Sequence, residues 1–154
     1  MIKSKFILGF FLISSIATAQ VVNLSGSWNL NSSKSKLNAE FSFAPKQIIL
    51  TQKGIELAVE KHYTYQDQDY KVSEKLTLDN NECTNTWFRE TQKKSTAAWS
   101  EDKKTILVNS KVSTDNNEIT IKEVYKMEGN NMVLESSASS PDGSISETFF
   151  YEKQ

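Results

Sequence analysis

Alternation of apolar and polar residues runs through the chain from Leu24 onward and constrains its fold more than any other feature. Successive side chains of a β-strand point to opposite faces, so a period of two predicts strands with one buried and one solvated face. Leu57 and Val59, for example, fall on one face, whereas Glu60 falls on the other. No later segment shows the spacing of three to four residues that predicts a helix. The chain is therefore predicted to be all-β.

Residues that favour turns interrupt this alternation at short, regular intervals. Gly, Asn, Asp and Ser accept positive φ angles or bond their own backbone, which suits tight hairpins. The turns are expected at residues 53–54, 66–69, 79–82, 115–117, 129–130 and 140–143. With strands expected at 24–30 and 46–52, this predicts an antiparallel up-and-down meander of about ten strands. Closing the meander into a barrel removes exposed strand edges, so we predict a barrel.

The first residues of the chain form an expected export signal. A basic start and a short apolar run lead to Ala17-Thr18-Ala19, which precedes Gln20. This order, with small residues at the cleavage point, is typical of secretory signal peptides. The apolar run is too short to anchor the chain in a bilayer. We therefore predict a signal peptide at 1–19, a single barrel domain at 20–154, and a periplasmic or extracellular location.

Charge and composition exclude several classes of partner. The chain has a formal net charge of −1 with scattered lysines, so it lacks the basic patch that binds nucleic acids or membrane surfaces. One Cys and one His do not supply a disulfide or the ligands of a structural zinc site. The face opposite the apolar residues is charged, which does not suit contact with lipid. We expect no cofactor, no metal, no nucleic acid, no membrane insertion after signal cleavage, and a monomer.

Hairpin turns determine which residues lie opposite each other on neighbouring strands, and thus how side chains are layered inside the barrel. A turn at 66–69 pairs Lys61 with Glu74, and the following turn sets Val72 beside Arg89. Carried around the barrel, this register predicts three levels: a mostly apolar floor, a mixed middle and a polar end.

The polar level contains the only arginine of the chain, Arg89, with the carboxylates of Glu123 and Glu147. Buried charges are costly unless they are paired or hydrated, so this level is expected to border water. The connection Asn31–Pro45, which is well beyond hairpin length, emerges at the same end. The mouth of the barrel is therefore predicted there.

The long connection is a candidate lid, with Phe41 and Phe43 as its apolar contacts. Below it, the lumen is predicted to bind an unidentified small molecule without catalysis. The residues expected to contact this ligand are Lys61, Tyr63, Glu74, Trp87, Arg89, Ser110, Glu123, Tyr125, Glu147 and Phe149.

Two other interpretations use the same residues. A small barrel can fill its lumen with side chains and act through its surface and loops as an interaction or inhibitor module. Lys61 and Glu74 would then form a cross-strand ion pair, and Arg89 would be the counter-ion of the other carboxylates. Alternatively, a pair of inward carboxylates could perform acid–base catalysis. A cavity of a few hundred cubic ångströms would favour the binding protein over the filled barrel.

The opening strand resembles the Gly-x-Trp start of lipocalins, which Gly26 and Trp28 match. In that family the tryptophan plugs the closed end of the barrel, and the resemblance implies this position for Trp28. The stretch 26–37, with 140–143 and 150–153, is similar to small exported lipocalin-like proteins of Bacteroidetes-type bacteria. The likeness implies a calycin barrel that binds a small, often apolar, molecule.

The chain departs from lipocalins because no arginine follows Arg89 to pack on the tryptophan. Its strand number is more similar to that of fatty-acid-binding barrels, in which a helical lid follows the first strand and an arginine meets the ligand's carboxylate. This resemblance implies such a role for Arg89. The carboxylates of Glu123 and Glu147 would oppose an anionic head group, so a polar or cationic ligand is expected.

Overall fold

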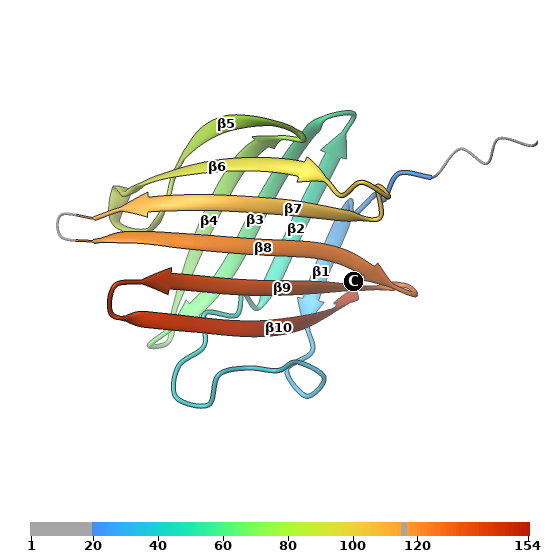
Figure 1. The fold of residues 1–154 in the computed structure, drawn as a ribbon. Coiled ribbons are helices and arrows are strands. Elements are labelled where there is room, and N and C mark those ends of the chain that lie inside the picture. The colour runs from blue at the N-terminus through green and yellow to red at the C-terminus, as the bar shows by residue number, and fades with distance from the viewer. Residues whose placement is uncertain (1–19, 115–116) are drawn as a thin grey trace, which may run out of the picture.

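The computed structural model describes residues 20–114 and 117–154, within which ten strands form one antiparallel sheet (Figure 1). The strands are β1 (Gly26–Leu30), β2 (Gln47–Lys53), β3 (Glu56–Tyr65), β4 (Gln68–Thr77), β5 (Asp79–Thr86), β6 (Gln92–Trp99), β7 (Thr105–Ser113), β8 (Glu118–Glu128), β9 (Asn131–Ser140) and β10 (Gly143–Lys153). The sheet order β4-β3-β2-β1-β10-β9-β8-β7-β6-β5 makes a nearly closed barrel. The predicted all-β up-and-down meander is confirmed. The expected signal peptide at 1–19 and the centre of the turn at 115–117 lie outside the described residues.

The pairing of β1 with β10 joins the two halves of the meander, while β4 and β5 end the sheet order. Between β4 and β5 the Asn85 side chain substitutes for a backbone ladder. Its Oδ1 accepts a hydrogen bond from the Lys75 N–H at 2.8 Å, and its Nδ2 donates to the Lys75 carbonyl at 3.1 Å. The side-chain amide thus pairs as a peptide group would, and it satisfies part of the edge of β4.

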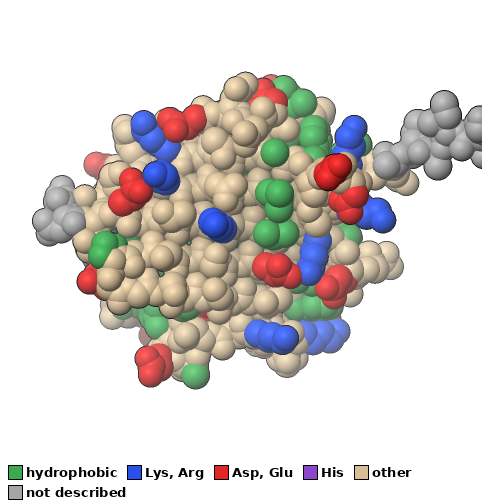
Figure 2. Space-filling view, viewed as in Figure 1, with side chains coloured by type: hydrophobic (Ala, Val, Ile, Leu, Met, Phe, Trp, Pro, Cys, Tyr) green, Lys and Arg blue, Asp and Glu red, His purple; other side chains and the backbone are tan. Residues whose placement is uncertain are grey.

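The outside of the barrel is polar, as the alternation predicts. Figure 2 shows basic and acidic side chains spread over one face, with a short row of hydrophobic atoms between them. On β7, for example, Ile106 and Val108 are buried, whereas Asn109 and Lys111 are exposed. Within residues 20–114 and 117–154, no helix is long and apolar enough to cross a membrane.

The β3–β4 hairpin is tighter than predicted. Its turn consists of Gln66 and Asp67, which both have positive φ, so Lys61 lies opposite Val72 rather than Glu74. Asp tolerates this left-handed backbone better than most residues, which allows a two-residue turn without glycine. The predicted pairing was wrong by two residues. Because side chains repeat every two residues, each one keeps its face and only its height in the barrel changes.

The β5–β6 connection changes the position of Arg89. Residues Phe88–Glu90 form a short 3₁₀ turn in which Arg89 and Glu90 both have positive φ. The turn ends the alternation before Arg89, whose side chain is exposed. The prediction that Arg89 faces the lumen beside Val72 is therefore wrong. Lys93, four residues later on β6, points into the lumen instead and is 2 % exposed.

Trp28 lies in the apolar core, 1 % exposed, and its Nε1–H donates to the Leu24 carbonyl at 2.9 Å. The segment that precedes β1 is held to the β6–β7 turn, where the Val22 N–H donates to the Lys103 carbonyl at 2.9 Å. That turn lies at the end of the barrel opposite the β3–β4 and β9–β10 turns (Figure 1). The start of the described chain therefore covers one barrel end, and access to the lumen is left to the other.

Candidate ligand cavity

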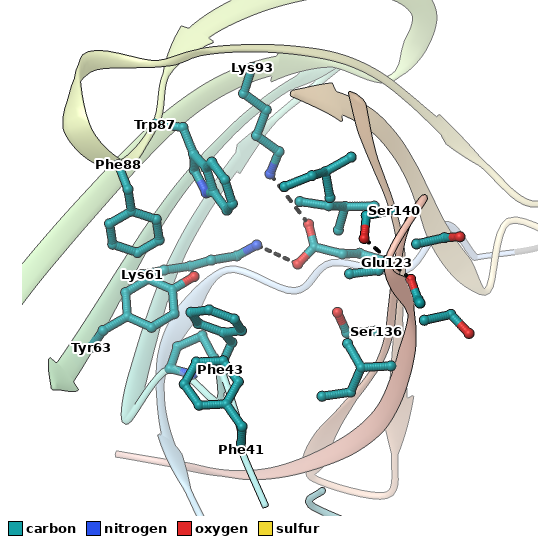
Figure 3. A pocket seen from close by; sticks show the side chains of 18 of the residues that line it. Phe41, Phe43, Lys61, Tyr63, Trp87, Phe88, Lys93, Glu123, Ser136 and Ser140 are labelled. Atoms are coloured by element: carbon teal, nitrogen blue, oxygen red, sulfur yellow. Dashed lines mark hydrogen bonds and ion pairs between the residues drawn. The ribbon is translucent and has the colours of Figure 1, made fainter. Parts of the chain in front are cut away.

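A cavity of about 430 Å³ opens at the barrel end that carries the β3–β4, β5–β6 and β9–β10 turns (Figure 3). One side of its wall is aromatic and comes from the connection after β1, from β3 and from the β5–β6 turn: Phe41, Phe43, Tyr63, Trp87 and Phe88. The other side carries aliphatic and small residues of β8, β9 and β10: Ile119, Ile121, Ser136, Ala138, Ser140 and Ile145. The cavity thus lies at the end where the sequence placed the mouth.

The aromatic side is organised into two groups of rings. Phe88 packs edge-on against Tyr63 and Trp87, with ring centroids 5.2 and 5.1 Å apart, respectively. Phe41 and Phe43 pack on each other at 4.2 Å and are 43 % and 55 % exposed. The left-handed residues of the β5–β6 turn carry a cost of roughly 1–2 kcal/mol each. This backbone holds Trp87 and Phe88 over the lumen, so the strain lies beside the candidate site.

Four charged side chains occupy the lumen at the inner end of the cavity. We call Lys61, Glu74, Lys93 and Glu123 the ion quartet. Lys61 Nζ donates a short hydrogen bond to Glu123 Oε1 and lies 3.7 Å from Glu74 Oε2. Lys93 Nζ lies 2.8 Å from Glu74 Oε1 and 3.9 Å from Glu123 Oε2. Two cations and two anions therefore balance one another where water is nearly excluded, which makes their burial tolerable.

The pKa values of Lys61 and Glu123 follow from this arrangement. Burial opposes the charge of Lys61, but the Glu123 carboxylate and its neighbours outweigh burial and hold the pKa of Lys61 well above its ordinary value. Burial likewise opposes the charge of Glu123, whose pKa is nevertheless lowered by Lys61 and Lys93. Burial raises the pKa of Tyr63 to about 12. Lys61 and Glu123 are thus both ionised, and Tyr63 is neutral, at neutral pH.

The sequence predicted that the charged residues lie at the mouth of the barrel, and the structure has them deeper in the lumen. Lys61, Lys93 and Glu123 line the inner end of the cavity and are at most 6 % exposed, whereas Phe41 and Phe43 lie at its exposed end (Figure 3). The shorter β3–β4 turn and the outward Arg89 account for the difference. The charged groups meet in mid-lumen, at the inner end of the cavity, rather than at its exposed rim.

Five of the ten predicted contact residues line the cavity: Lys61, Tyr63, Trp87, Glu123 and Phe149. Three more are lumen residues outside its lining: Glu74 in the quartet, buried Tyr125, and Ser110, which shares a 2.8 Å hydrogen bond with Ser95. Glu147 lies beneath the lid, and Arg89 is on the outside. Contact between these side chains and a ligand stays a prediction. Lys93 was missed, although it continues the alternation of Ser95, Ala97 and Trp99 by one step.

The connection between β1 and β2, residues 31–46, is irregular and contains no helix, unlike the lid implied by the fatty-acid-binding barrels. Glu147 holds it in place: Oε1 accepts the Asn38 N–H at 2.8 Å, and Oε2 accepts the Phe43 N–H at 3.4 Å. Lys36 exchanges two backbone hydrogen bonds with Thr148 nearby. Glu147 therefore contacts the lid, and the pairing with Arg89 that a filled barrel would have is not formed.

Replacing Glu147 by Leu is expected to release the lid while leaving the barrel folded. Only the carboxylate joins the amides of Asn38 and Phe43 to β10, and hydrogen bonds to a charged acceptor contribute about 1.5–3 kcal/mol each. We expect amide hydrogen exchange at both positions to accelerate by about tenfold or more, with exchange at Leu134 in the core unchanged. Glu135→Leu, on the outer face of β9, is the control. Equal protection in Glu147→Leu and the wild type would show that the carboxylate does not hold the lid.

The free energy of unfolding is expected to be highest between about pH 5 and pH 10. The pKa of Glu123 is below 4.5 in the folded state, so its stabilising contribution is lost as the pH falls through that lowered value. The pKa of Lys61 is above 10.5, so its contribution is lost as the pH rises through the raised value. Tyr63 adds to the alkaline loss, because its pKa rises from 10.0 to about 12 on folding. Urea titrations across pH measure the profile, and an alkaline limb equally steep in Tyr63→Phe would contradict this role.

No protein-family model matches the chain, and no curated protein matches it. Solved structures with a similar fold include human cRBP IV (18 % identity, TM-score 0.54, covering 86 % of this chain and 99 % of that one). A secretory abundant heat soluble protein from Ramazzottius varieornatus is 18 % identical, with a TM-score of 0.55 and coverage of 85 % and 95 %. Zebrafish ileal bile acid-binding protein, complexed with cholic acid, is 13 % identical, with a TM-score of 0.57 and coverage of 84 % and 98 %. At these identities the comparison shows the fold, a nearly closed calycin-like barrel.

Proposed function

We propose that the chain is an exported, non-catalytic β-barrel that binds a small molecule in its lumen. The cavity of about 430 Å³ beneath the lid carries this proposal. Its volume falls within the range of small-molecule sites, and its lining is mostly apolar with a few polar groups, as in such sites. The similar zebrafish barrel is complexed with cholic acid, which supports this use of the fold.

The proposed ligand occupies only the outer part of the lumen. Below the ion quartet, apolar side chains such as Leu57, Ile106 and Met132 are packed and at most 2 % exposed. The expected polar mouth and apolar floor are accordingly revised: the mouth is aromatic, the cavity floor is charged, and the apolar floor lies beneath both. Of the predicted contacts, we retain Lys61, Tyr63, Trp87, Glu123 and Phe149 as ligand-binding residues.

A non-catalytic role is supported by the engagement of the two inward carboxylates that could have formed an acid–base pair. Glu123 is bound by Lys61, and Glu147 accepts the backbone N–H groups of the lid. A general acid or base must reach the proton that it transfers. Both groups are committed to partners within the protein, so neither is available for this task.

Export is supported by the composition of residues 1–19 and by the likeness of the opening strand to exported proteins of Bacteroidetes-type bacteria. We propose a monomer that is released into the periplasm or outside the cell. The intact mass of the secreted protein tests signal cleavage, because cleavage after Ala19 leaves Gln20 as the first residue. A mass that includes residues 1–19 would contradict export by cleavage.

Native mass spectrometry of protein purified from its exported pool, without denaturation, tests the binding function. A retained small molecule that is lost on heating would support a binding barrel and give its mass. A protein that carries no ligand and also fails to bind N-phenyl-1-naphthylamine would contradict the proposal. The filled-barrel interpretation, with a protein partner at the surface or loops, would then replace it.

A further inference from the structure

The ion quartet at the inner end of the cavity carries no net charge, because it contains two lysines and two glutamates. Each lysine of the ion quartet lies within 4.0 Å of both glutamates. An anionic ligand that paired with Lys61 would compete with Glu123, whose remaining cation would be the more distant Lys93, 3.9 Å away. Breaking a buried ion pair in this way costs about 3–5 kcal/mol. A cationic ligand that paired with Glu123 would displace Lys61 at a similar cost.

The remaining lining offers apolar contact and uncharged polar groups. The hydroxyls of Tyr63, Ser136 and Ser140 face a wall whose other members are mainly aromatic and aliphatic. Tyr63 stays protonated because burial raises its pKa to about 12. Asp142, a carboxylate of the cavity rim, lies in the exposed β9–β10 turn. The inner lining is therefore suited to a ligand that forms a few neutral hydrogen bonds.

The aromatic side chains of the wall favour rings over a flexible chain. Phe41 and Phe43 face the cavity from the lid, and Tyr63 with Phe88 faces it from the barrel (Figure 3). Aromatic faces and edges interact favourably with other rings, contributing about 0.5–1.5 kcal/mol per pair beyond the burial of area. A rigid ligand also loses less conformational entropy on binding than a chain of similar size.

We propose that the ligand is an uncharged, ring-bearing apolar molecule with one or a few hydrogen-bonding groups. This inference rests on the proposed binding function and specifies its ligand class. It replaces the polar or cationic ligand expected from the sequence, because the glutamate of the quartet that lines the cavity is neutralised by Lys93 as well as Lys61.

Two fluorescent probes with the same rings test the charge preference. N-Phenyl-1-naphthylamine is uncharged, and 1-anilinonaphthalene-8-sulfonate adds one sulfonate to it. We expect the dissociation constant of the uncharged probe to be lower by about tenfold or more. Glu123→Gln leaves two lysines with one glutamate, a surplus of one positive charge. The ratio of the two dissociation constants should therefore narrow by about fivefold or more. An unchanged ratio in a folded Glu123→Gln would overturn the inference.

A second variant covers the case in which Glu123→Gln does not fold. Glu74→Gln also leaves a surplus of positive charge, on Lys93, which lines the cavity. The same narrowing of the probe ratio is expected. The preference for rings is tested by displacing the uncharged probe with 1-naphthalenemethanol or 1-decanol. Stronger displacement by decanol, the more hydrophobic of the two, would overturn the ring preference.

The site of probe binding is tested by filling the cavity. Ala138→Trp places an indole in the lumen, whereas Ser137→Trp places one on the outer face of the same strand. Loss of probe binding in Ala138→Trp alone would support a lumen site. If both probes bind equally and Ala138→Trp abolishes both, the binding function stands and the ligand class is wrong. If neither probe binds and no ligand is retained, the function itself fails.

Discussion

Lys61→Met is expected to lower the free energy of unfolding by about 3–5 kcal/mol, the usual consequence of removing one partner from a buried ion pair. The substitution leaves Glu74 and Glu123 in the lumen with Lys93 as their shared cation. Both carboxylates are at most 6 % exposed, so water compensates the missing charge poorly. Urea unfolding followed by tryptophan fluorescence measures the loss.

Arg89→Met is the matched control, because it removes a cation from the outside of the same barrel. Its side chain is exposed, so we expect a change within about 0.5 kcal/mol. A double variant, Lys61→Met with Glu123→Leu, removes one charge of each sign and leaves Lys93 with Glu74. It is expected to be more stable than Lys61→Met alone. If the double variant lost as much as the two single variants combined, charge balance would not be what keeps the quartet together.

Trp28→Ala is expected to destabilise the fold by about 3–5 kcal/mol, as large-to-alanine changes do at fully buried aromatic residues. The indole is 1 % exposed and packs in the core, and its Nε1–H donates to the Leu24 carbonyl. Alanine would leave a cavity and an unpaired buried carbonyl group. Thermal and urea unfolding measure the effect.

Trp87→Ala is the corresponding control at the open end of the barrel. Trp87 is half-buried and lines the ligand cavity, so truncating it should cost clearly less stability than Trp28→Ala. It should weaken the binding of N-phenyl-1-naphthylamine, which Trp28→Ala affects only through folding. Equal losses of stability in the two variants would contradict the assignment of Trp28 to the core and Trp87 to the site.

The strands could be predicted from the sequence because alternation survives small errors of register. In the β3–β4 hairpin the pairing was wrong by two residues, yet Lys61 and Glu74 both face the lumen as predicted. A period of two makes the inward set insensitive to such a slip. The same slip does change the height of each side chain along the barrel, so the three predicted levels do not contain the residues expected of them.

The misplacement of Arg89 comes from a turn that residue types do not reveal. Arg89 and Glu90 adopt left-handed backbone without being glycine or asparagine, so nothing in the sequence marks the end of β5 there. Alternation carried through Trp87 therefore placed Arg89 in the lumen. Lys93 lay one step before the strand that alternation identified, and lysine is almost never fully buried without a partner. The quartet could be recognised only once four strands were brought together in space.

The single amide of Asn85 has a consequence for the solubility of the barrel. It lies where β4 and β5 come together without a ladder, so both strands present backbone groups that could pair with another chain. Exposed strand edges recruit further strands, and short or covered edges resist this. Asn85 bonds the Lys75 N–H and carbonyl, so these two groups of the β4 edge are no longer free to pair with a strand of another chain. The amide of one side chain thus does at this seam what a neighbouring strand does elsewhere in the sheet.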